Sequence, residues 1–594
     1  MLLRRLRFLG WALLLAVVCP VAAGEQEDLA AARSVFDRNL EAIRKRDREA
    51  YLACYLDKES FARTGPPGMQ TGFREHAARS VSDPWPDLFE GLDLRLVRVS
   101  DGVVYGTYRY RVRYGATEDR GLSERLFVRT PAGWRIAMTS AFSAPPGTPP
   151  PPRALTGGIL VDGRGGPPVR DSVVVMREGR IECAGTREAC PVPGGVETMD
   201  VRGTWITPGL IDAHVHFSQT GWADGRPDAL DARDRNPYEE TVGRLRAHPE
   251  TFFRSYLCSG VTAVFDVGGY AWTVGLVERA ENDPAAPRVA AAGPLVTTRD
   301  HWINMPAERQ FMHATDPNVA RAGVSYLAAL GSSAVKFYYI VEPGRTAADY
   351  VPLAVATVEE AKARGIPVLS HATGLEEARE SLRAGVRMLV HSVWDKPVDD
   401  EFLELARRQN AVYCPTLTVR DGYMKMYQWA ATGERPANVP DDPRSCVDPD
   451  TRARLDETPR YKDRAPADLA RRLERLAADR AVMDANLMRV SRAGITVAMG
   501  TDAGNPLTLH GVSVNAEMEA MQAAGMKPMD VLVASTLGSA RAMGREKDLG
   551  TIESGKAADL LVLDNDPTAS VDAFRAPRWI VRGGVVRGAR ELGY

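Results

Sequence analysis

The first part of the chain shows two hydrophobic patterns in succession. The stretch EDLAAARSVFDRNLEAIRKRDREAYLACY, residues 27–55, has apolar residues at helical spacing. Later stretches such as VVYGTYRYRVRY (103–114) and GWRIAMTSAF (133–142) alternate in the way that long antiparallel strands do. We therefore predict that residues 24–144 form an α+β unit in which helices come first and a curved sheet follows.

The middle of the chain, residues 206–544, repeats short and continuously apolar strands with helical segments between them. The strands include GVTAVFDVG (260–268) and AVKFYYI (334–340), and the helices include AADYVPLAVATVEEAKARG (347–365). Strands that are apolar on both faces are typical of a parallel sheet covered by helices. This many strand–helix units predict an α/β fold, a (β/α)8 TIM barrel. Residues 420–485 interrupt the rhythm, and we interpret them as an insertion over the barrel mouth.

Shorter segments separate and flank these two regions. The stretch APPGTPPPPR ends at Arg153, and its proline content predicts a stiff linker over residues 145–153. Residues 154–205 and 545–594 both contain short strands separated by turns rich in Gly, Pro and Asp. We expect these two pieces to meet as one small β-sandwich beside the barrel.

The first 23 residues have the pattern of a secretory signal peptide. Arg4, Arg5 and Arg7 precede an apolar run over residues 9–18, and small residues surround the expected cleavage site after Ala23. The run is too short for a comfortable membrane span. We expect an exported protein, periplasmic or secreted, that is not associated with a membrane after cleavage.

Composition narrows the classes of function and partner. The hydrophobic fraction of 44% and the charged fraction of 26% are those of a globular protein, and the formal net charge is only −2. That charge gives no electrostatic basis for binding nucleic acid. We expect a small-molecule substrate as the partner, with a homo-oligomer possible.

The seven cysteines, one of them in the signal peptide, bear on the compartment. Export permits disulfides. Cys183 and Cys190 lie close together around a turn and could pair, and Cys414 could pair with Cys446. For Cys54 and Cys258, a reduced and buried state is weighed equally with a disulfide.

The stretch GLIDAHVHF, residues 209–217, places two histidines on an apolar strand. Side chains two residues apart share one face of a strand, so His214 and His216 point the same way, about 7 Å apart at their backbones. An apolar sheet face gains nothing from two adjacent imidazoles, whereas a bound metal would use both. Alone, a His-x-His pair is a weak signal, since such pairs also arise by accident.

Other predicted strands also end in residues that can bind a metal. LSHA ends near His371, LVHS near His391 and AMGTDAG near Asp502, and Lys336 lies within AVKFYY. Barrel enzymes build their active sites at the carboxyl ends of their strands. Each residue alone could be structural, but four of the nine histidines fall at such ends. Together they predict a metal site at the barrel mouth.

In order and spacing, the motifs PGLIDAHVHF, VKFY, SHA, VHS and GTDAGNP resemble the amidohydrolase superfamily. The resemblance is greatest to its imidazolonepropionase-like branch, which includes prolidase-type dipeptidases acting on Xaa-Pro or N-acyl amino acid substrates. It covers residues 154–594. Residues 24–144 resemble, by pattern alone, the NTF2-like/SnoaL-like cone fold.

The resemblance implies a binuclear metal site. By position, His214, His216 and Asp502 would hold one divalent ion, with zinc favoured, and His371 and His391 a second. Lys336 would be N-carboxylated by CO2 and bridge both ions. In such a site a metal-bridging hydroxide attacks the substrate carbonyl, and Asp502 transfers the proton.

Residues around the mouth are candidates for substrate contacts. His301 is matched to a family histidine near the substrate carbonyl, as a catalytic or binding residue, and Arg299 and Tyr338 lie close to it or to the lysine strand. His510, in NPLTLHG, is a further candidate, with a supporting role behind the ligands as the alternative.

These residues predict a metal-dependent amidohydrolase of peptidase or amidase type. It would cleave an amide (C–N) bond in a small substrate such as a dipeptide or an N-acyl amino acid. The alternatives within enzymes are hydrolysis of cyclic amides or lactones, and a mononuclear deaminase. Lys336 argues against the deaminase, because such sites lack the bridging lysine. The alternative from a different class is an inactive ligand-binding protein.

Overall fold

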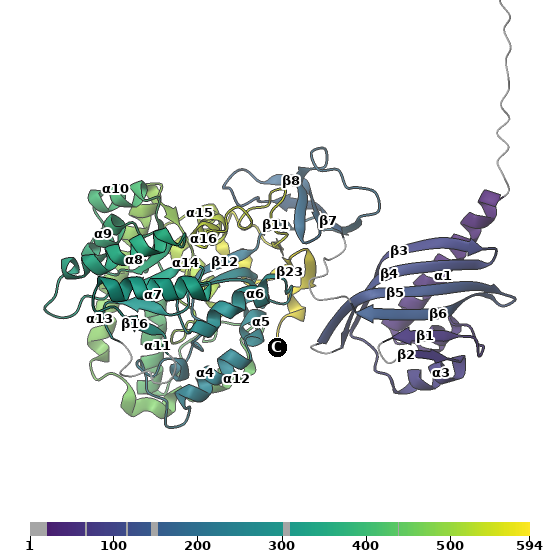
Figure 1. Cartoon of the computed structure of the whole chain (residues 1–594), viewed down its shortest axis with the longest axis horizontal. Coiled ribbons are helices and arrows are strands. Elements are labelled where there is room, and N and C mark those ends of the chain that lie inside the picture. The colour runs from purple at the N-terminus through teal and green to yellow at the C-terminus, as the bar shows by residue number, and fades with distance from the viewer. Residues whose placement is uncertain (1–20, 66–67, 115–116, 144–151, 301–308, 438) are drawn as a thin grey trace, which may run out of the picture. The chain divides into compact units, whose positions relative to one another are not determined.

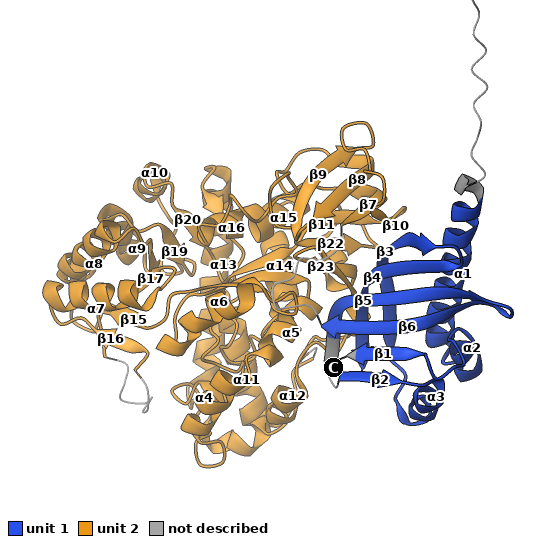
Figure 2. Cartoon of the chain, turned by 45° about the vertical axis from the view of Figure 1, so that its right-hand side comes forward, with its two compact units in different colours: residues 1–151 blue, residues 152–594 orange. Residues whose placement is uncertain are grey.

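The computed structural model describes residues 21–65, 68–114, 117–143, 152–300, 309–437 and 439–594. The chain divides into two compact units, unit 1 (Met1–Pro151) and unit 2 (Pro152–Tyr594), as Figures 1 and 2 show. The predicted signal peptide and the predicted linker fall almost entirely outside the described residues. Among the helices of the described segments, none has both the length and the apolar character that a membrane span needs.

Within its described residues, unit 1 consists of three helices and one six-stranded sheet. The strands are ordered β2-β1-β6-β5-β4-β3, and the pairs are antiparallel except β1 with β6. The elements are α1 (Val21–Lys45), α2 (Arg48–Ala53), β1 (Ala62–Gly65), β2 (Gly68–Thr71), α3 (Phe73–Ser82), β3 (Leu88–Ser100), β4 (Val103–Tyr114), β5 (Thr117–Thr130) and β6 (Gly133–Ser143). An α+β unit was expected here, although a short hairpin and α3 come between the first helices and the long strands.

The alternation that predicted the strands also places the core of unit 1. In β4, Val104, Tyr108 and Val112 are buried on one face of the sheet. They share a hydrophobic cluster with Phe36 and Leu40, which lie one helical turn apart on α1. The apolar stripe of α1 and the inward face of the sheet therefore form one core. The likeness to the NTF2-like fold stays a prediction.

The two flanks of unit 2 join in one eight-stranded sheet. Its strands are β7 (Arg153–Leu160), β8 (Val169–Arg177), β9 (Arg180–Thr186), β10 (Glu197–Asp200), β11 (Trp205–Pro208), β22 (Leu560–Leu563), β23 (Pro577–Arg582) and β24 (Val585–Gly588). The early and late segments meet where β11 pairs antiparallel with β22. The two pieces predicted to form a small sandwich are thus hydrogen-bonded to each other directly.

The strands of the middle region pair in parallel and form a ring. They are β12 (Leu210–Val215), β13 (Val261–Asp266), β14 (Arg288–Ala291), β15 (Leu295–Thr297), β17 (Val335–Tyr338), β18 (Val368–His371), β19 (Met388–Val390), β20 (Val412–Cys414) and β21 (Thr496–Val497), with β16 (Phe311–His313) beside β15. Beyond β21, the Ala213 amide donates to the Met499 carbonyl and the His216 amide to the Ala503 carbonyl. These bonds join the last strand to the first, which gives a TIM-barrel-like α/β fold.

Helices follow most of these strands and cover them (Figure 1). They are α4 (Tyr238–Ala247), α5 (Glu250–Cys258), α6 (Leu276–Glu281), α7 (Pro317–Leu330), α8 (Val351–Ala363), α9 (Leu375–Ala384), α10 (Asp400–Arg408), α14 (Ser513–Ala523), α15 (Pro528–Val533) and α16 (Ser539–Ala542). Capping is visible at α7, where the Asp316 side chain accepts from two amides of the first turn and Gly331 ends the helix in the left-handed region. The insertion contributes α11 (Val419–Thr432), α12 (Pro449–Leu455) and α13 (Leu469–Arg492).

The disulfides differ in part from the predicted pairs. Cys183 and Cys190 are bonded, as the turn between them suggested. The pairing of Cys414 with Cys446 is wrong, because Cys446 is bonded to Cys258 at the end of α5. Of the two states open for Cys258, the structure has the disulfide.

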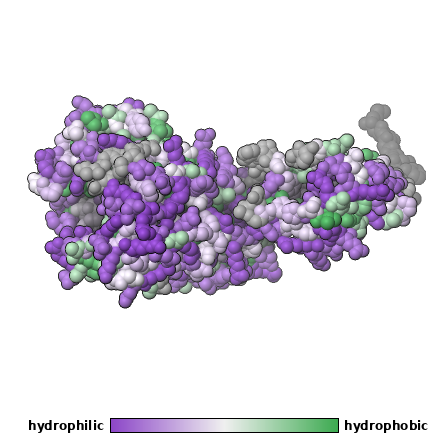
Figure 3. Space-filling model, turned by 90° about the horizontal axis from the view of Figure 1, so that it is seen from below, coloured by the Kyte–Doolittle hydropathy of each residue, from purple (hydrophilic) through white to green (hydrophobic). Residues whose placement is uncertain are grey.

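Cys414 is a free, buried thiol, as is Cys54. Cys414 ends β20 inside the barrel wall, where a Cβ built on Gly500 would lie 2.5 Å from its Sγ. Cys446 lies instead beside the end of α5, with its Cα 5.5 Å from that of Cys258. On the face in Figure 3, hydrophilic residues predominate and hydrophobic ones form only small patches.

The division into two units generates a prediction about truncation. A chain beginning at Pro152 contains the complete unit 2, so it should fold, bind metal and retain the hydrolytic activity of the full chain within about a factor of three. Circular dichroism, metal analysis and the same kinetic assay on both chains provide the comparison. An insoluble or inactive truncated chain, beside an active full chain, would show that unit 1 is integral to the barrel.

Candidate metal centre

The predicted ligands come from several strands, with His214 and His216 at the end of the same one, but they lie at one end of the barrel. His214 lies near the end of β12, Lys336 within β17 and His371 at the end of β18. His391 directly follows β19, and Asp502 lies in the loop after β21. All these strands run parallel, so their carboxyl ends meet at the same rim.

The tightest cluster surrounds the Asp502 carboxylate. Its Oδ1 lies 3.2 Å from His214 Nε2 and 2.9 Å from His216 Nε2, and these two nitrogens are 3.3 Å apart. Its Oδ2 lies 3.9 Å from His391 Nδ1. In a tetrahedral site with bonds of about 2.0–2.1 Å, neighbouring ligand atoms lie about 3.3 Å apart, so this spacing suits one small cation.

The remaining predicted ligands extend the cluster along the rim. The rings of His214 and His391 are 4.9 Å apart, and those of His391 and His371 are 4.5 Å apart, measured between centroids. Lys336 is 1% exposed, and its charge affects both His214 and His391. Four histidines, one lysine and one aspartate therefore occupy one small region.

Hydrogen bonds orient two of these imidazoles. His216 Nδ1 lies 2.6 Å from the Gly268 carbonyl, to which it donates, and this leaves the Nε2 lone pair facing Asp502. His391 Nδ1 lies 2.7 Å from Thr416 Oγ1. Contacts of this kind select one ring nitrogen for a metal.

Asp212 holds the backbone of the cluster together. Its Oδ1 accepts from the amides of His214 (3.2 Å) and Thr501 (3.0 Å), and its Oδ2 accepts from the Thr501 hydroxyl at 2.6 Å. The side chain is fully buried, and burial raises the pKa of Asp212 to about 7. One carboxyl group thus connects the strand carrying His214 to the loop carrying Asp502.

The backbone is strained at two of the predicted ligands. Asp502 has a φ of 63° and His391 a φ of 73°, both in the left-handed region that non-glycine residues rarely adopt. Such a conformation costs about 1–2 kcal/mol per residue and persists where the surroundings enforce it. Strain at two of the predicted ligands on the same rim indicates a functional site.

Burial and charge keep the ligand atoms in the forms that a metal requires. Burial, with Lys336 nearby, lowers the pKa of His214 to about 3, so its imidazole is neutral at physiological pH. Burial by itself raises the pKa of Asp502, but His214 and His216 hold it well below its ordinary value. Burial lowers the pKa of Lys336 to about 8, so its neutral amine is readily populated.

The donor set fits a divalent metal ion. His214, His391 and Asp502 each offer a ligand atom, and these atoms lie within 4.8 Å of one another. Asp502 Oδ1 and His214 Nδ1 are buried without a hydrogen-bond partner in the described part of the chain. Imidazole nitrogen and carboxylate oxygen are the ligands that zinc and similar ions take in hydrolases. The structure therefore contains a possible metal site at the predicted position.

The predicted substrate residues lie in different surroundings. Tyr338 ends β17 with its ring 4.4 Å from that of His371, at the rim. Arg299 is exposed, yet its charge is close enough to lower the pKa of Tyr338, which burial raises. His301 lies outside the described residues.

His510 lies behind the cluster. Its Nδ1 is 2.8 Å from the Tyr256 hydroxyl and its Nε2 is 2.8 Å from the Gln219 carbonyl. With both ring nitrogens engaged, it is placed for the supporting role, and not for substrate contact.

Sequence reasoning missed a polar network that connects the insertion to Asp502. The Tyr423 hydroxyl on α11 donates to Asn505 Oδ1 at 2.6 Å, and Asn505 Nδ2 donates to the Asp502 carbonyl at 3.0 Å. Arg226 also donates to Asn505 Oδ1 and stacks over the Tyr423 ring. These residues have no common motif, and only the insertion's predicted place over the mouth pointed to them.

The chain belongs to the amidohydrolase family, a family of hydrolytic enzymes. Residues 205–589, more than half of the chain, match the sequence profile described as "Amidohydrolase family". This stretch contains every described residue of the metal cluster, and the flanking strands β11 and β22.

Individual relatives match over limited lengths. An imidazolonepropionase from Methylobacterium sp. (strain 4-46) is 30% identical over 237 residues, which span 35% of this chain and 55% of the relative. The chain thus spans about half the length of that relative. The solved structures of a Xaa-Pro dipeptidase with bound methionine and of molinate hydrolase align with TM-scores of 0.56 and 0.57, each at 21% identity. They cover 74% of this chain and 100% and 95% of their own, and show the likeness of fold.

The bonds of Asp212 generate a prediction about metal affinity. Replacing Asp212 by alanine leaves the His214 and Thr501 amides without their acceptor, so zinc affinity should fall about 10- to 100-fold. Zinc titration against a chromophoric chelator gives the affinity, with circular dichroism to verify folding. Asp212→Asn keeps an acceptor oxygen and should bind zinc almost as tightly as the original chain. Unchanged affinity in the alanine variant would contradict the role assigned to Asp212.

Proposed function

We propose that unit 2 is a binuclear metal hydrolase that cleaves an amide (C–N) bond in a small substrate, such as a dipeptide or an N-acyl amino acid. The observation that carries this proposal is the convergence of four histidines, Asp502 and the buried Lys336 at one barrel rim. The family membership supports hydrolysis, and a neighbour described as a Xaa-Pro dipeptidase supports the class of substrate.

The ligands divide into two sets around the lysine. His214, His216 and Asp502 would hold one ion, and His371 and His391 would hold the second, with zinc as the favoured metal. When bound, such ions polarise a carbonyl and acidify a water molecule.

Lys336 would act as the bridge only after modification. A lysine ammonium has no lone pair and cannot bind a cation. Its neutral amine, which burial favours, can attack CO2; an N–C bond forms, one proton leaves, and the product is a carbamate with two oxygens. With those oxygens, Lys336 would offer a ligand to each of the two ions.

In this proposal Asp502 moves the proton. Its Oδ1 faces the two histidine nitrogens, whereas its Oδ2 lies 3.9 Å from His391 Nδ1. Its lowered pKa keeps the carboxylate ionised and able to accept a proton from the attacking water. Donation of that proton to the departing nitrogen completes cleavage of the C–N bond.

The insertion would limit the size of the substrate. Tyr423 of α11 lies within hydrogen-bond distance of Asn505, three residues from Asp502, so this helix borders the mouth. A covered mouth favours small molecules over polymers. Arg299, Tyr338 and His301 are the candidates to bind a free carboxylate there.

The disulfides support an exported protein. Two bonds, Cys183–Cys190 and Cys258–Cys446, are typical of an oxidising compartment such as the periplasm or the exterior. We therefore retain the periplasmic or secreted location as part of the proposal.

Lys336→Met tests whether a carboxylated Lys336 bridges the two ions. It also distinguishes a hydrolase from an inactive ligand-binding protein. Methionine fills similar space without a carbamate, so metal content should fall from near two ions per chain to about one. The kcat/KM for amide substrates should fall at least about 10³-fold, or about 4 kcal/mol of transition-state stabilisation. Elemental analysis and kinetics supply the two readouts.

Lys362→Met, at an exposed position on α8, removes the same charge elsewhere and should change neither readout. Full activity in Lys336→Met would disprove the carbamate. An original chain that holds zinc but cleaves no amide, cyclic amide or lactone would disprove the hydrolase.

A matched pair of substrates tests whether the enzyme prefers an amide substrate that has a free carboxylate. An N-acyl amino acid with a free carboxylate should be hydrolysed better than its methyl amide, because Arg299 can bind the carboxylate. In Arg299→Ala the kcat/KM of the free acid should fall about 10- to 100-fold, and that of the amide should change little.

Arg321→Ala removes an arginine on α7 that pairs with Glu359, and serves as the control. Equal hydrolysis of both substrates, or a clear preference for lactones or for deamination, would refute the proposed substrate class.

A further inference from the structure

Unit 1 contains a cavity of about 380 Å³. This volume is in the range of small-molecule sites. Its lining includes Tyr51, Tyr55, His76, Trp85, Tyr108 and Arg125. None of its lining residues is among the metal-ligand or substrate candidates of the barrel, so the pocket has no place in the hydrolase proposal.

Arg125 is a buried cation at the wall of this pocket. It is 6% exposed, and its guanidinium donates to the hydroxyls of Ser123 (2.8 Å), Thr139 and Tyr108 (2.6 Å). It also lies over the Tyr108 ring, 5.1 Å from the centroid. All these side-chain partners are neutral hydroxyl groups, while Nε is buried without a hydrogen-bond partner in the described part of the chain.

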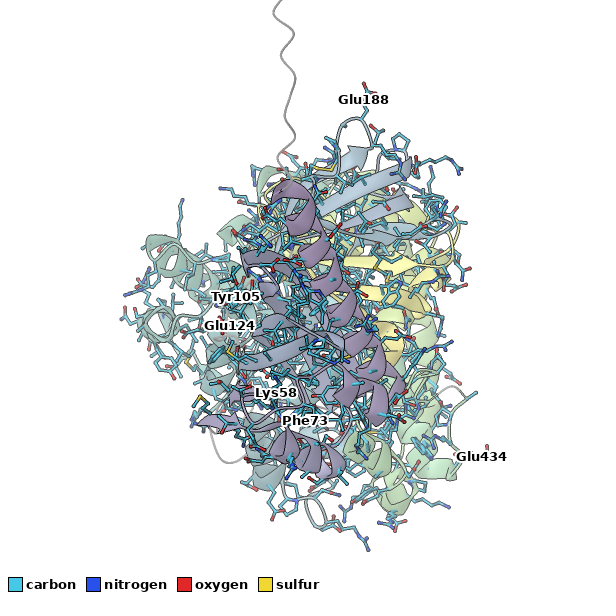
Figure 4. The ribbon with its side chains drawn as sticks, turned by 90° about the vertical axis from the view of Figure 1, so that its right-hand side faces the viewer. Lys58, Phe73, Tyr105, Glu124, Glu188 and Glu434 are labelled. Carbon is cyan, nitrogen blue, oxygen red and sulfur yellow. A yellow bond between two sulfur atoms is a disulfide. The ribbon has the colours of Figure 1, made fainter. Side chains whose placement is uncertain are left out.

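Within the described residues, no carboxylate neutralises Arg125. The neighbouring Glu124 points to the opposite face of β5, where the Tyr105 hydroxyl binds it at 2.6 Å; the two lie side by side in Figure 4. Asp119 lines the pocket but accepts from the hydroxyls of Tyr110 and Ser143. A buried charge without a counter-charge is unfavourable, and a bound anion would remove that penalty.

His76 is a second unsatisfied group in the same pocket. It is 5% exposed, and neither of its ring nitrogens has a hydrogen-bond partner among the described residues. Its ring lies 4.7 Å from that of Tyr55 and 4.9 Å from that of Phe61. Burial, with Arg63 and Arg125 nearby, lowers the pKa of His76 to about 4, so it is neutral and has one N–H to donate.

The rest of the lining indicates the body of the ligand. Aromatic side chains, including Trp85, Phe89 and Tyr110, form part of the wall, and they favour a flat apolar group. Exposed Arg63 and Arg79 also line the pocket, so three arginines face two aspartates there. The pocket therefore combines an anion-binding wall with an aromatic cage.

We propose that this pocket binds a small organic carboxylate with an aromatic or flat apolar body, whose carboxylate takes the place beside Arg125 and His76. The bidentate geometry of arginine suits a carboxylate, and the ring would pack against Tyr51, Tyr55 and Trp85. The site is separate from the barrel rim and does not depend on the hydrolase proposal.

The probe is benzoate, titrated calorimetrically into the full chain after chelator treatment, so that metal ions in the barrel take no part. We expect saturable binding at one site per chain. Benzamide, which has the same ring without the charge, should bind at least tenfold more weakly, and inorganic phosphate should not bind. Absence of benzoate binding, or equal binding of benzamide, would overturn the proposal, and phosphate binding in its place would point to a simple anion site.

Two variants locate the binding. Arg125→Met should weaken benzoate binding at least tenfold, without changing hydrolysis by the barrel. Arg129→Met is the matched control, because Arg129 lies on the same strand but pairs with Asp28 and Asp101 and does not line the pocket. Benzoate affinity that survives Arg125→Met would assign the binding to another place and refute the site.

His76→Phe keeps the test decisive if Arg125→Met fails to fold. Phenylalanine suits the aromatic surroundings and removes two unsatisfied nitrogens, so the thermal midpoint of unfolding should rise while benzoate affinity falls at least threefold. A merely structural histidine would give a changed midpoint with unchanged affinity, and that result would exclude His76 from the site.

Discussion

A buried carboxyl group, that of Asp212, joins the first strand of the barrel to the loop after the last one, and the metal cluster depends on this connection. It holds the amide of His214 on one side and both the amide and the hydroxyl of Thr501 on the other. His214 itself takes part in these bonds, and Asp502 is the residue after Thr501. The closure of the barrel therefore sets the distance between His214 and Asp502. The same residue thus contributes to the fold and to the site.

Close packing around Gly500 also supports this connection. A Cβ on Gly500 would lie 2.7 Å from the Cβ of His214 and 2.5 Å from Cys414 Sγ, so only glycine allows the last strand to approach so closely. The left-handed conformations of Asp502 and His391 lie in the segments that follow β21 and β19. The barrel wall is regular and apolar, while strain and unsatisfied polar atoms gather at its rim, as expected where function opposes stability.

Both units contain buried polar atoms that have no hydrogen-bond partner among the described residues. At the rim of unit 2, His214 Nδ1 and Asp502 Oδ1 are buried without partners beside groups suited to a cation. In unit 1, Arg125 Nε and both nitrogens of His76 are buried without partners beside an aromatic pocket. Buried polar groups are nearly always paired in folded proteins, so such positions indicate ligands of opposite character: a cation in one unit and an anion in the other.

The sequence by itself determined the elements and the chemistry available at the barrel rim. Apolar runs with two histidines at i and i+2, or with a histidine or aspartate at the end, predicted parallel strands and one metal-binding edge, because strand periodicity and strand direction are local properties. The ligand assignment to two ions and a carboxylated lysine stays a prediction. What only the tertiary structure decided were contacts between distant segments: the pairing of Cys258 with Cys446, the link from Tyr423 to Asn505, the position of His510 behind the cluster, and the pocket around Arg125. These contacts depend on how segments far apart in the sequence pack against each other. A local pattern of hydrophobic and polar residues does not specify that packing.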